Sequence, residues 1–355
     1  MNKVRVLIVD DSAVVRSVLS ELLSFDKNIE VIGEAVDPFD ARDKIKKLKP
    51  DVLTLDIEMP KMDGLTFLRN IMKLRPMPVV MLSTLTHAGS DVTLQALEIG
   101  AVDFISKPVS SARDGELRAF QAELINKVRM AARTAEKLKF RPSIHKKTVN
   151  PVSFQAIQAI EHDSQSIVAI GASTGGTEAL MNLLSGLPEN VPPIVVTQHI
   201  PASFSARFAN RLNDQSLLTV TEAKEGDILK QGHVYISPGS HHMVVKQHGN
   251  RLICNLDDRG LVNRHKPSVE VMFLSILDIT PSKATAIMLT GMGEDGAKAM
   301  KELADAGAHT IVQDEASSLV WGMPGAVVKY GAAKEVLALS KIADRLIQHL
   351  SRKVE

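Results

Sequence analysis

A serine in a glycine-rich turn is the first residue of this sequence that could do covalent chemistry. Ser173 lies in Gly-Ala-Ser-Thr-Gly-Gly, residues 171–176, directly after an apolar run at 166–170. Glycines on both sides of a serine allow a tight turn from strand to helix that lifts the hydroxyl out of the sheet. Such a turn can also hold a phosphate or a dinucleotide, because a helix N-terminus presents N–H groups to an anion. The stricter Gly-x-Gly-x-x-Gly spacing is absent, however, and the next apolar run ends in Gln198-His199 rather than in an acidic residue.

A serine nucleophile needs a base and an acid that orients the base, and the sequence offers both. His199 follows the apolar run at 194–198, and Asp295 lies in Thr-Gly-Met-Gly-Glu-Asp-Gly, just after the run at 284–289. If these runs are parallel strands, the three side chains lie at one edge of the sheet. His199 would take the proton of Ser173, and Asp295 would hold the imidazole. The chain order Ser, His, Asp differs from the Ser, Asp, His order of the α/β-hydrolase fold, so the sequence predicts a serine hydrolase of another fold.

A second group of candidate residues is acidic. Asp10 and Asp11 follow the apolar run at 4–9, and Asp56 follows the run at 52–55. Three carboxylates at one sheet edge repel each other unless a cation joins them. Carboxylate oxygens with open positions beside them suit Mg²⁺, which keeps several of its waters. The sequence therefore predicts a magnesium site formed by these aspartates.

A hydroxyl and an ammonium group are expected beside these carboxylates. Ser83 and Lys107 each end a further apolar run of the same half of the chain. Their presence is explained if a phosphoryl group is carried on one carboxylate, with Mg²⁺ and Lys107 neutralising its charge. The alternative is that the aspartates are helix N-caps, as Asp11 and Asp37 could be. Capping does not explain the pair Lys107-Pro108.

Apolar runs alternate with helical patterns in both halves of the chain, which is typical of a parallel sheet with helices on both faces. The sequence therefore predicts an α/β protein with two doubly wound parallel-sheet domains. Two shorter runs flank Gly249-Asn250 and predict a hairpin. The strand-like runs are residues 4–9, 31–35, 52–55, 78–82 and 102–105, and then 166–171, 194–197, 218–221, 234–237, 284–289 and 309–312.

A polar stretch separates the two halves. It runs from residue 139 to about 164, contains Pro142 and Pro151, and has no sustained apolar period, so it is typical of a linker. We therefore predict domains at residues 1–125 and 164–355, joined by a linker at 126–163.

Composition excludes several classes of protein. The 355 residues carry a formal net charge of +1, so no global field favours nucleic acid or an anionic membrane. The one cysteine, Cys254, excludes an internal disulfide and a multi-cysteine zinc site. No apolar run approaches the roughly 20 residues of a membrane span, and the N-terminus lacks the pattern of a secretory signal. We expect a cytoplasmic protein that is not embedded in a membrane and does not bind nucleic acid.

The motifs of the first half resemble the receiver domains of two-component response regulators, which have a flavodoxin-like fold. They are Val-Leu-Ile-Val-Asp-Asp-Ser, Leu-Thr-Leu-Asp-Ile-Glu-Met-Pro-Lys-Met-Asp-Gly, Val-Val-Met-Leu-Ser and Phe-Ile-Ser-Lys-Pro, in the family's order over about 110 residues. The resemblance implies that Asp56 accepts a phosphoryl group from a histidine kinase. It also implies that Asp11 and Asp56 bind Mg²⁺ with the support of Asp10, and that Ser83 and Lys107 contact the phosphoryl group. It further implies that Phe104 changes rotamer with the switch.

The second half resembles the Rossmann-like catalytic domain of chemotaxis protein-glutamate methylesterases of the CheB type. The shared motifs include Ile-Gly-Ala-Ser-Thr-Gly-Gly-Thr-Glu-Ala, Thr-Gln-His-Ile-Pro and Thr-Gly-Met-Gly-Glu-Asp-Gly-Ala. The resemblance implies hydrolysis of glutamyl methyl esters on the cytoplasmic helices of membrane-bound chemoreceptors, with release of methanol, and deamidation of specific glutamines. It implies Ser173, His199 and Asp295 as a catalytic triad, the N–H of Met292 as an oxyanion donor, and no cofactor for the hydrolysis.

Three matters stay open at this point. The segment from Arg264 to Ser268 could contact an acidic receptor helix or be a solvated loop, and His241-His242 could have a structural or a substrate-groove role. An alternative function is a non-enzymatic response regulator whose second half binds a partner. For an enzyme joined to a switch by one linker, our hypothesis is that the unphosphorylated receiver hinders substrate entry and phosphorylation relieves this.

Overall fold

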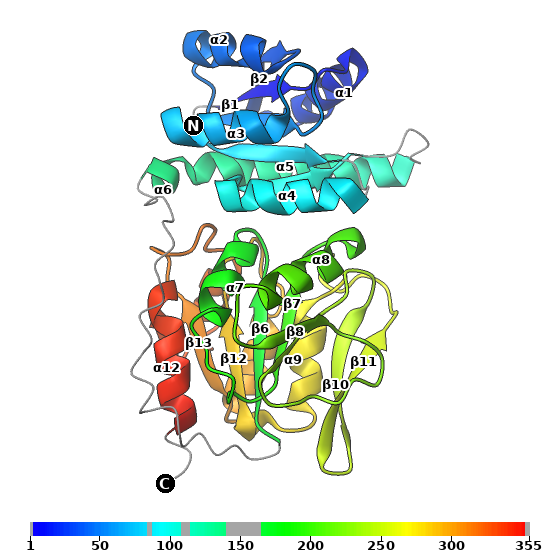
Figure 1. The fold of residues 1–355 in the computed structure, drawn as a ribbon, viewed down its shortest axis with the longest axis vertical. Helices are drawn as coiled ribbons and strands as arrows, with labels where there is room; N and C mark the ends of the chain where they lie inside the picture. Colours follow the sequence, from blue (N-terminus) through cyan, green and yellow to red (C-terminus); the bar gives the residue numbers. More distant parts are fainter. Residues whose placement is uncertain (1–2, 84–86, 108–113, 140–164, 352–355) are drawn as a thin grey trace. The chain divides into compact units, whose positions relative to one another are not determined.

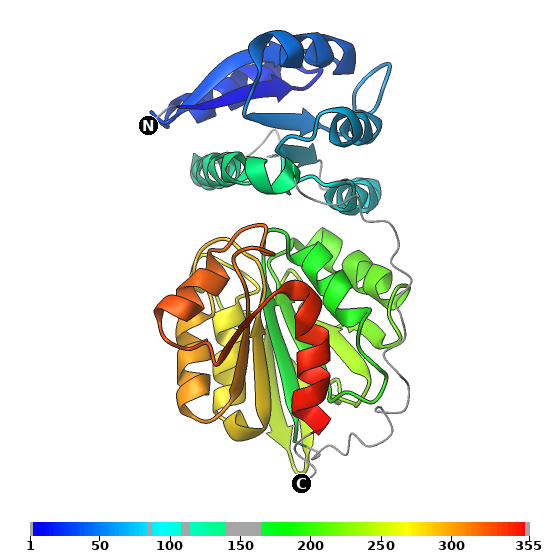
Figure 2. The same cartoon turned by 90° about the vertical axis from the view of Figure 1, so that its left-hand side faces the viewer.

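The computed structural model describes residues 3–83, 87–107, 114–139 and 165–351. The chain divides into two compact units, residues 1–145 and residues 146–355, each of which has its own sheet (Figures 1 and 2). Pro108 and the part of the predicted linker after residue 139 lie outside the described residues. The division at residues 125 and 163 stays a prediction, and residue 125 lies within helix α5 (Asp114–Arg133).

The first unit has a five-stranded parallel sheet in the order β2-β1-β3-β4-β5. This order reverses direction between β1 and β3, and ligands of doubly wound sheets bind at such a point. Every residue of β3 and β4 is buried, as expected for strands covered on both faces. The elements are β1 (Val4–Val9), α1 (Ala13–Ser24), β2 (Ile29–Ala35), α2 (Pro38–Leu48), β3 (Val52–Asp56), α3 (Gly64–Leu74), β4 (Val79–Ser83), α4 (His87–Ile99), β5 (Asp103–Ser106), α5, and α6 (Ala135–Lys139).

The second unit has a seven-stranded parallel sheet in the order β14-β13-β12-β6-β7-β9-β8. Its direction reverses around β6, which has β7 on one side and β12 on the other. A separate antiparallel hairpin, β10-β11, confirms the predicted turn at Gly249-Asn250. The strands are β6 (Ile167–Ala172), β7 (Ile194–Gln198), β8 (Thr219–Glu222), β9 (His233–Ile236), β10 (His242–His248), β11 (Arg251–Asp257), β12 (Ala284–Met288), β13 (His309–Gln313) and β14 (Glu335–Leu337).

Helices cover both faces of this sheet (Figure 2). Helices α7, α8 and α12 lie on one face, and α9, α10 and α11 lie on the other. The predicted α/β class with two parallel-sheet domains is therefore confirmed, whereas β14 and α11 had not been predicted. The helices are α7 (Gly176–Leu184), α8 (Ala202–Asn213), α9 (Val269–Leu277), α10 (Ala297–Asp305), α11 (Met323–Lys329) and α12 (Leu339–Ser351). Among the described residues, no helix combines the length and the apolar character that crossing a membrane requires.

Candidate active site

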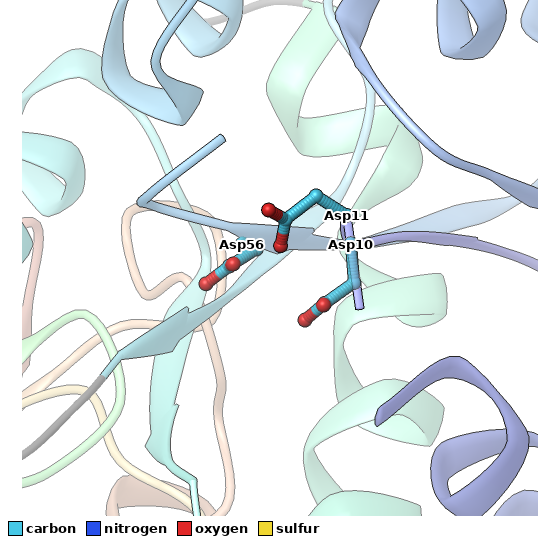
Figure 3. Close-up of side chains that lie close together, drawn as sticks. All are labelled: Asp10, Asp11 and Asp56. Atoms are coloured by element: carbon cyan, nitrogen blue, oxygen red, sulfur yellow. The ribbon is translucent and has the colours of Figure 1, made fainter. Parts of the chain in front are cut away.

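Three aspartates meet at the reversal point of the first sheet. Asp10 and Asp11 follow β1, and Asp56 ends β3, so the pairing of these strands brings them together (Figure 3). One oxygen of each carboxylate lies within 4.8 Å of the others. Asp10 and Asp56 are buried and Asp11 is exposed. The arrangement leaves one side of the cluster open to solvent, as a site that exchanges a ligand requires.

Lys107 holds the two buried carboxylates together. Its Nζ lies 2.8 Å from Asp10 Oδ2 and 2.7 Å from Asp56 Oδ1. Burial raises the pKa of Asp56 to about 6, although Lys107 acts against this rise. For Lys107 burial alone would lower the pKa, but the hydrogen bonds and charges of Asp10 and Asp56 outweigh it and raise the pKa. The lysine is therefore a fixed positive charge at this pocket.

The cluster fits a divalent cation. Asp10 Oδ2 is fully buried, and Lys107 Nζ lies 2.8 Å from it. The one positive charge of this lysine does not balance three carboxylate charges, so the cluster favours a further cation. Three carboxylate oxygens from Asp10, Asp11 and Asp56 form the kind of ligand set that hard cations prefer.

The remaining receiver candidates are also placed near this pocket. Ser83 ends β4 and is buried, and its Oγ accepts a hydrogen bond from Thr93 Oγ1 at 2.8 Å. Its carbonyl oxygen accepts from the backbone N–H of Lys107 at 2.8 Å, so the two residues are held side by side. Phe104 is buried, and Lys127 Nζ lies 5.2 Å from the centre of its ring. The predicted rotamer change of Phe104 stays a prediction.

The capping alternative is right for one aspartate and wrong for the other. Asp37 caps α2, because its Oδ1 accepts hydrogen bonds from the N–H groups of Phe39 and Asp40, each at 2.9 Å. Helix α1 is capped by Ser12 and not by Asp11. Asp11 is thus left with its carboxylate at the acidic cluster.

In the second unit, Ser173 lies on a tight turn between β6 and α7. Gly175 caps α7 with φ +77°, a left-handed conformation that favours glycine. A Cβ on Gly176 would lie 2.2 Å from Gln198 Oε1 and 2.7 Å from Ala172 Cβ, so the close approach of these residues favours glycine. The carbonyl oxygen of Ser173 accepts hydrogen bonds from Gly176 N at 2.7 Å and from Gln198 Nε2 at 2.9 Å. These contacts hold the backbone of the serine from two sides.

Strand register places His199 beside Ser173. Ala172 pairs with Gln198 across β6 and β7, and Ser173 and His199 are the next residues of the two strands. The N–H of His199 donates to the carbonyl oxygen of Ala172 at 3.1 Å, which extends the pairing by one residue. The two side chains therefore leave neighbouring strands at the same level.

The carboxylate of Asp295 takes part in four hydrogen bonds, one of which joins it to His199. Its Oδ2 contacts His199 Nε2 at 2.9 Å and accepts from the N–H of Val269, the first residue of α9, at 2.7 Å. Its Oδ1 accepts from Asn263 Nδ2 at 2.9 Å and from Ser268 Oγ at 2.8 Å. Burial alone would raise the pKa of Asp295, but the hydrogen bond and charge of His199 and the other donors lower it to about 2. The carboxylate is therefore ionised at neutral pH.

The charge of Asp295 determines the tautomer of His199. An ionised carboxylate can only accept, so the proton of the neutral imidazole is on Nε2 and the free electron pair is on Nδ1. Nδ1 is buried and has no hydrogen-bond partner within the described residues. No hydrogen bond joins Ser173 Oγ to His199 in this part of the chain, and such bonds are often long before substrate binds. Nδ1 is the nitrogen that could accept the proton of a nucleophile.

The loop that contains Met292 lies against the serine. A Cβ on Gly291 would lie 2.8 Å from Ser173 Cβ, and the N–H of Ser173 donates to Thr290 O at 3.0 Å. Within the described residues, no backbone hydrogen bond uses the N–H of Met292. The oxyanion role of Met292 stays a prediction.

Some residues at the site were not predicted. Gln198 lies under the serine turn, and Asn263 and Ser268 contact Asp295 from a loop that has no apolar period. The adjacent histidines also differ from each other. His242 is fully buried, accepts from Ser268 N through Nδ1 and contacts Gly260 O through Nε2, so both ring nitrogens have partners within the protein. His241 is partly exposed.

Comparison with known proteins gives the same division into two parts. Residues 168–346 match the family model described as CheB methylesterase, and residues 6–116 match the response regulator receiver domain. A Xanthomonas campestris pv. campestris protein named protein-glutamate methylesterase/protein-glutamine glutaminase 1 is 53% identical over 348 residues, which are 97% of this chain and 96% of that protein. A Hydrogenovibrio crunogenus protein named protein-glutamate methylesterase/protein-glutamine glutaminase is 47% identical over 372 residues, with coverage of 98% and 99%.

A solved structure is similar to the second unit. The catalytic domain of Thermotoga maritima CheB methylesterase matches with a TM-score of 0.51 and 39% identity, and the match covers 52% of this chain and 98% of that domain. The catalytic part of that protein was thus solved without its receiver.

Proposed function

Because this chain belongs to the CheB methylesterase family and carries a response regulator receiver domain, we propose that it demethylates glutamyl methyl esters of chemoreceptors and deamidates specific receptor glutamines. The observation that carries the proposal is the ionised Asp295 on Nε2 of His199, which leaves Nδ1 as the base beside Ser173. The receptor helices that carry these esters face the cytoplasm, so the proposal places the enzyme there.

The geometry supports a two-step acyl transfer. His199 Nδ1 takes the proton of Ser173 Oγ while the oxygen attacks the ester carbonyl carbon, and the N–H of Met292 stabilises the oxyanion. The imidazolium gives its proton to the departing methanol, which leaves an acyl-enzyme. Water then attacks the acyl carbon with the help of the same imidazole, which breaks the bond to Ser173 Oγ and leaves a glutamate side chain on the receptor. In deamidation the leaving group is ammonia and the steps are otherwise the same.

Asp295 acts only through the imidazole. It fixes the ring at Nε2 and stabilises the positive charge that forms when Nδ1 gains a proton. Its own charge is secured by the donors Asn263, Ser268 and Val269 N, and by the N-terminus of α9, whose partial positive charge favours an anion.

The proposed regulation is phosphorylation of Asp56 by a histidine kinase. Mg²⁺ would be held by Asp11 and Asp56, with Asp10 orienting its shell, and it would neutralise charge on the phosphoryl group during transfer. Lys107 is already paired with Asp56 and supplies a second positive charge, and Ser83 supplies a hydroxyl. Phosphorylation adds about −1.5 to −2 charges to this pocket.

The test is methanol release from methylated chemoreceptor membranes, with and without acetyl phosphate as phosphodonor. Wild-type protein should release methanol, and acetyl phosphate should raise the rate. Ser173→Ala should remove release while the protein keeps its circular dichroism spectrum. Receptor binding without methanol release by the wild-type protein would instead support a non-enzymatic regulator.

A truncation tests the direction of regulation. The Thermotoga maritima structure shows that the catalytic part of a relative exists as a separate domain, so deletion of residues 1–140 is a fair experiment. If the receiver is inhibitory, the truncated protein should release methanol faster than the unphosphorylated full chain. Equal or slower methanol release would contradict inhibition by the receiver. It would not contradict the proposed hydrolase activity.

A further inference from the structure

The ring of His265 lies flat on the ring of the catalytic base. The two ring centres of His199 and His265 are 3.8 Å apart and the planes differ by 10°. His265 belongs to the segment from Arg264 to Ser268, for which the sequence alone leaves substrate contact and a solvated loop equally open. The stacking gives one residue of that segment a direct contact with the proposed triad.

The loop that carries His265 is held in a costly conformation. Val262 and His265 exchange two backbone hydrogen bonds, at 3.0 and 2.9 Å. The two residues between them, Asn263 and Arg264, have φ of +51° and +69° although neither is glycine. For Arg264 such a conformation costs about 1–3 kcal/mol and persists where surrounding contacts determine it, whereas asparagine adopts it more readily. The conformation of this turn therefore determines the position of His265 over His199.

The same turn also contacts the acid of the triad. Asn263 donates to Asp295 Oδ1 at 2.9 Å, while His265, two residues later, contacts the imidazole that Asp295 holds. The loop thus fixes both partners of the His199–Asp295 pair from one side. A loop that served only to connect β11 and α9 would not need either contact.

The stacking restrains a motion that the hydrogen bond to Asp295 leaves free. His199 is anchored by its ring at Nε2 alone, and one hydrogen bond permits the ring to rock about the N–H axis. Rocking would move Nδ1 away from Ser173 Oγ, because Nδ1 has no partner of its own within the described residues. A flat ring at 3.8 Å blocks that movement and presents its π face to the imidazolium that forms in the reaction.

We propose that His265 is a positioning residue, which holds the imidazole of His199 in the plane where Nδ1 meets the serine hydroxyl. The proposal rests on the proposed function of His199 as the base. It assigns no proton transfer to His265. A flat aromatic ring at position 265 should therefore be able to replace the histidine, and a branched aliphatic side chain should not.

The test compares three variants of the full chain in methanol release. His265→Ala should lower kcat by about 10- to 100-fold, the range expected when a catalytic group is misplaced by about 1 Å, with little change in KM. His265→Phe should recover kcat to within a few fold of wild type, whereas His265→Leu should resemble the alanine variant. His248→Ala is the matched control, since this exposed histidine at the hairpin end of β10 should leave kcat unchanged.

A spectroscopic measurement separates positioning from general loss of stability. In ¹⁵N NMR of the histidine rings, the wild-type protein should show one tautomer of His199 with the proton on Nε2, and His265→Ala should show exchange broadening of these signals. Equal rates for the alanine variant and wild type overturn the proposal, as does equal recovery by leucine and phenylalanine. Absence of hydrolysis in the wild-type protein would instead reject the proposed function.

Discussion

His199 Nε2 and Asp295 Oδ2 are 2.9 Å apart, and this contact determines which nitrogen of the imidazole can act as a base. With Asp295 ionised, Nε2 must carry the proton of the neutral imidazole, and the free electron pair is on Nδ1. The carboxylate is also bonded to the N-terminus of α9 through Val269 N at 2.7 Å. The acid of the proposed triad is thus bonded to the first backbone N–H of a helix, which restrains the position of its carboxylate.

The first prediction concerns the charge of this carboxylate. Asp295→Asn should lower kcat for methanol release by roughly 10³- to 10⁴-fold, because the amide stabilises the wrong tautomer of His199 and cannot balance an imidazolium. KM should change little. Asn263→Ala is the matched control: it removes one of four donors to Asp295 and should cost about tenfold or less. A loss for Asp295→Asn no larger than that of the control would show that the charge is unimportant.

The second prediction concerns stability in acid. The folded pKa of Asp295 is about 2, below the ordinary 3.8, so the group stabilises the fold above pH 3.8 and this stabilisation disappears as the pH falls toward 2. A shift of this size corresponds to roughly 2 kcal/mol. Unfolding can be followed by fluorescence of Trp321, the one tryptophan, which lies in the catalytic unit. Between pH 6 and 3, the wild-type protein should lose more unfolding free energy than Asp295→Asn, and parallel curves would contradict the assignment.

Most of the residues that the sequence could predict stand where a strand ends, whereas Asp295 lies in the loop between β12 and α10. Parallel strands place their carboxyl ends at one edge, so strand positions alone were enough to predict that Asp56 and Lys107 meet. The same holds for Ser173 and His199, which follow paired strands. Periodicity identifies the strands, and the geometry of a parallel sheet then places the residues at their carboxyl ends together.

The residues that the sequence could not predict stand in loops. Asn263 and Ser268 contact Asp295 across 32 and 27 positions of chain, from a loop whose path depends on two left-handed residues that are not glycine. Nothing in composition or periodicity marks such residues. The sequence also could not decide whether Asp11 or Ser12 caps α1, because both residue types are good caps and only the backbone conformation decides between them.

The third prediction concerns the acidic cluster. Removal of divalent cations with a chelator should abolish the stimulation of methanol release by acetyl phosphate and leave the basal rate unchanged, because the proposed triad contains no metal ligand. Asp56→Asn should behave in the same way with Mg²⁺ present. Asp43→Asn is the matched control, since this aspartate is exposed and lies on α2, outside the acidic cluster. Stimulation that survives both the chelator and Asp56→Asn would remove Asp56 as the phosphoacceptor.

The fourth prediction concerns Gly64, which packs against the backbone of the proposed phosphoacceptor Asp56. A Cβ on Gly64 would lie 1.9 Å from the carbonyl oxygen of Asp56, an overlap with rigid backbone. Gly64→Ala should therefore lower the free energy of unfolding of the receiver in urea by about 1–3 kcal/mol or more. It should also lower phosphorylation of the receiver by acetyl phosphate. Gly115→Ala, in an exposed turn of α5 with no atom within 4 Å of the added Cβ, should be neutral or stabilise by up to about 1 kcal/mol. Equal stability of the two variants would contradict the contact.

The fifth prediction concerns Arg264, which lies between the two residues that contact the triad. It is exposed and makes no ion pair or hydrogen bond with the described residues, whereas neighbouring Lys266 is paired with Asp258 at 2.6 Å. An unpaired cation beside the site suits a substrate helix that carries free carboxylates around the ester. Arg264→Glu should therefore raise KM for methylated receptors by about tenfold, with kcat and the hydrolysis of a small uncharged methyl ester unchanged.

The control for Arg264 is another exposed arginine at a distance from the triad. Arg251 stands at the start of β11, at the hairpin turn, and Arg251→Glu makes the same change in net charge. An equal rise in KM for both variants would indicate a general effect of charge on membrane association, not recognition by Arg264. A rise confined to Arg264→Glu that weakens at high salt supports direct contact with substrate carboxylates, because exposed ion pairs are screened over about 10 Å at 0.1 M salt.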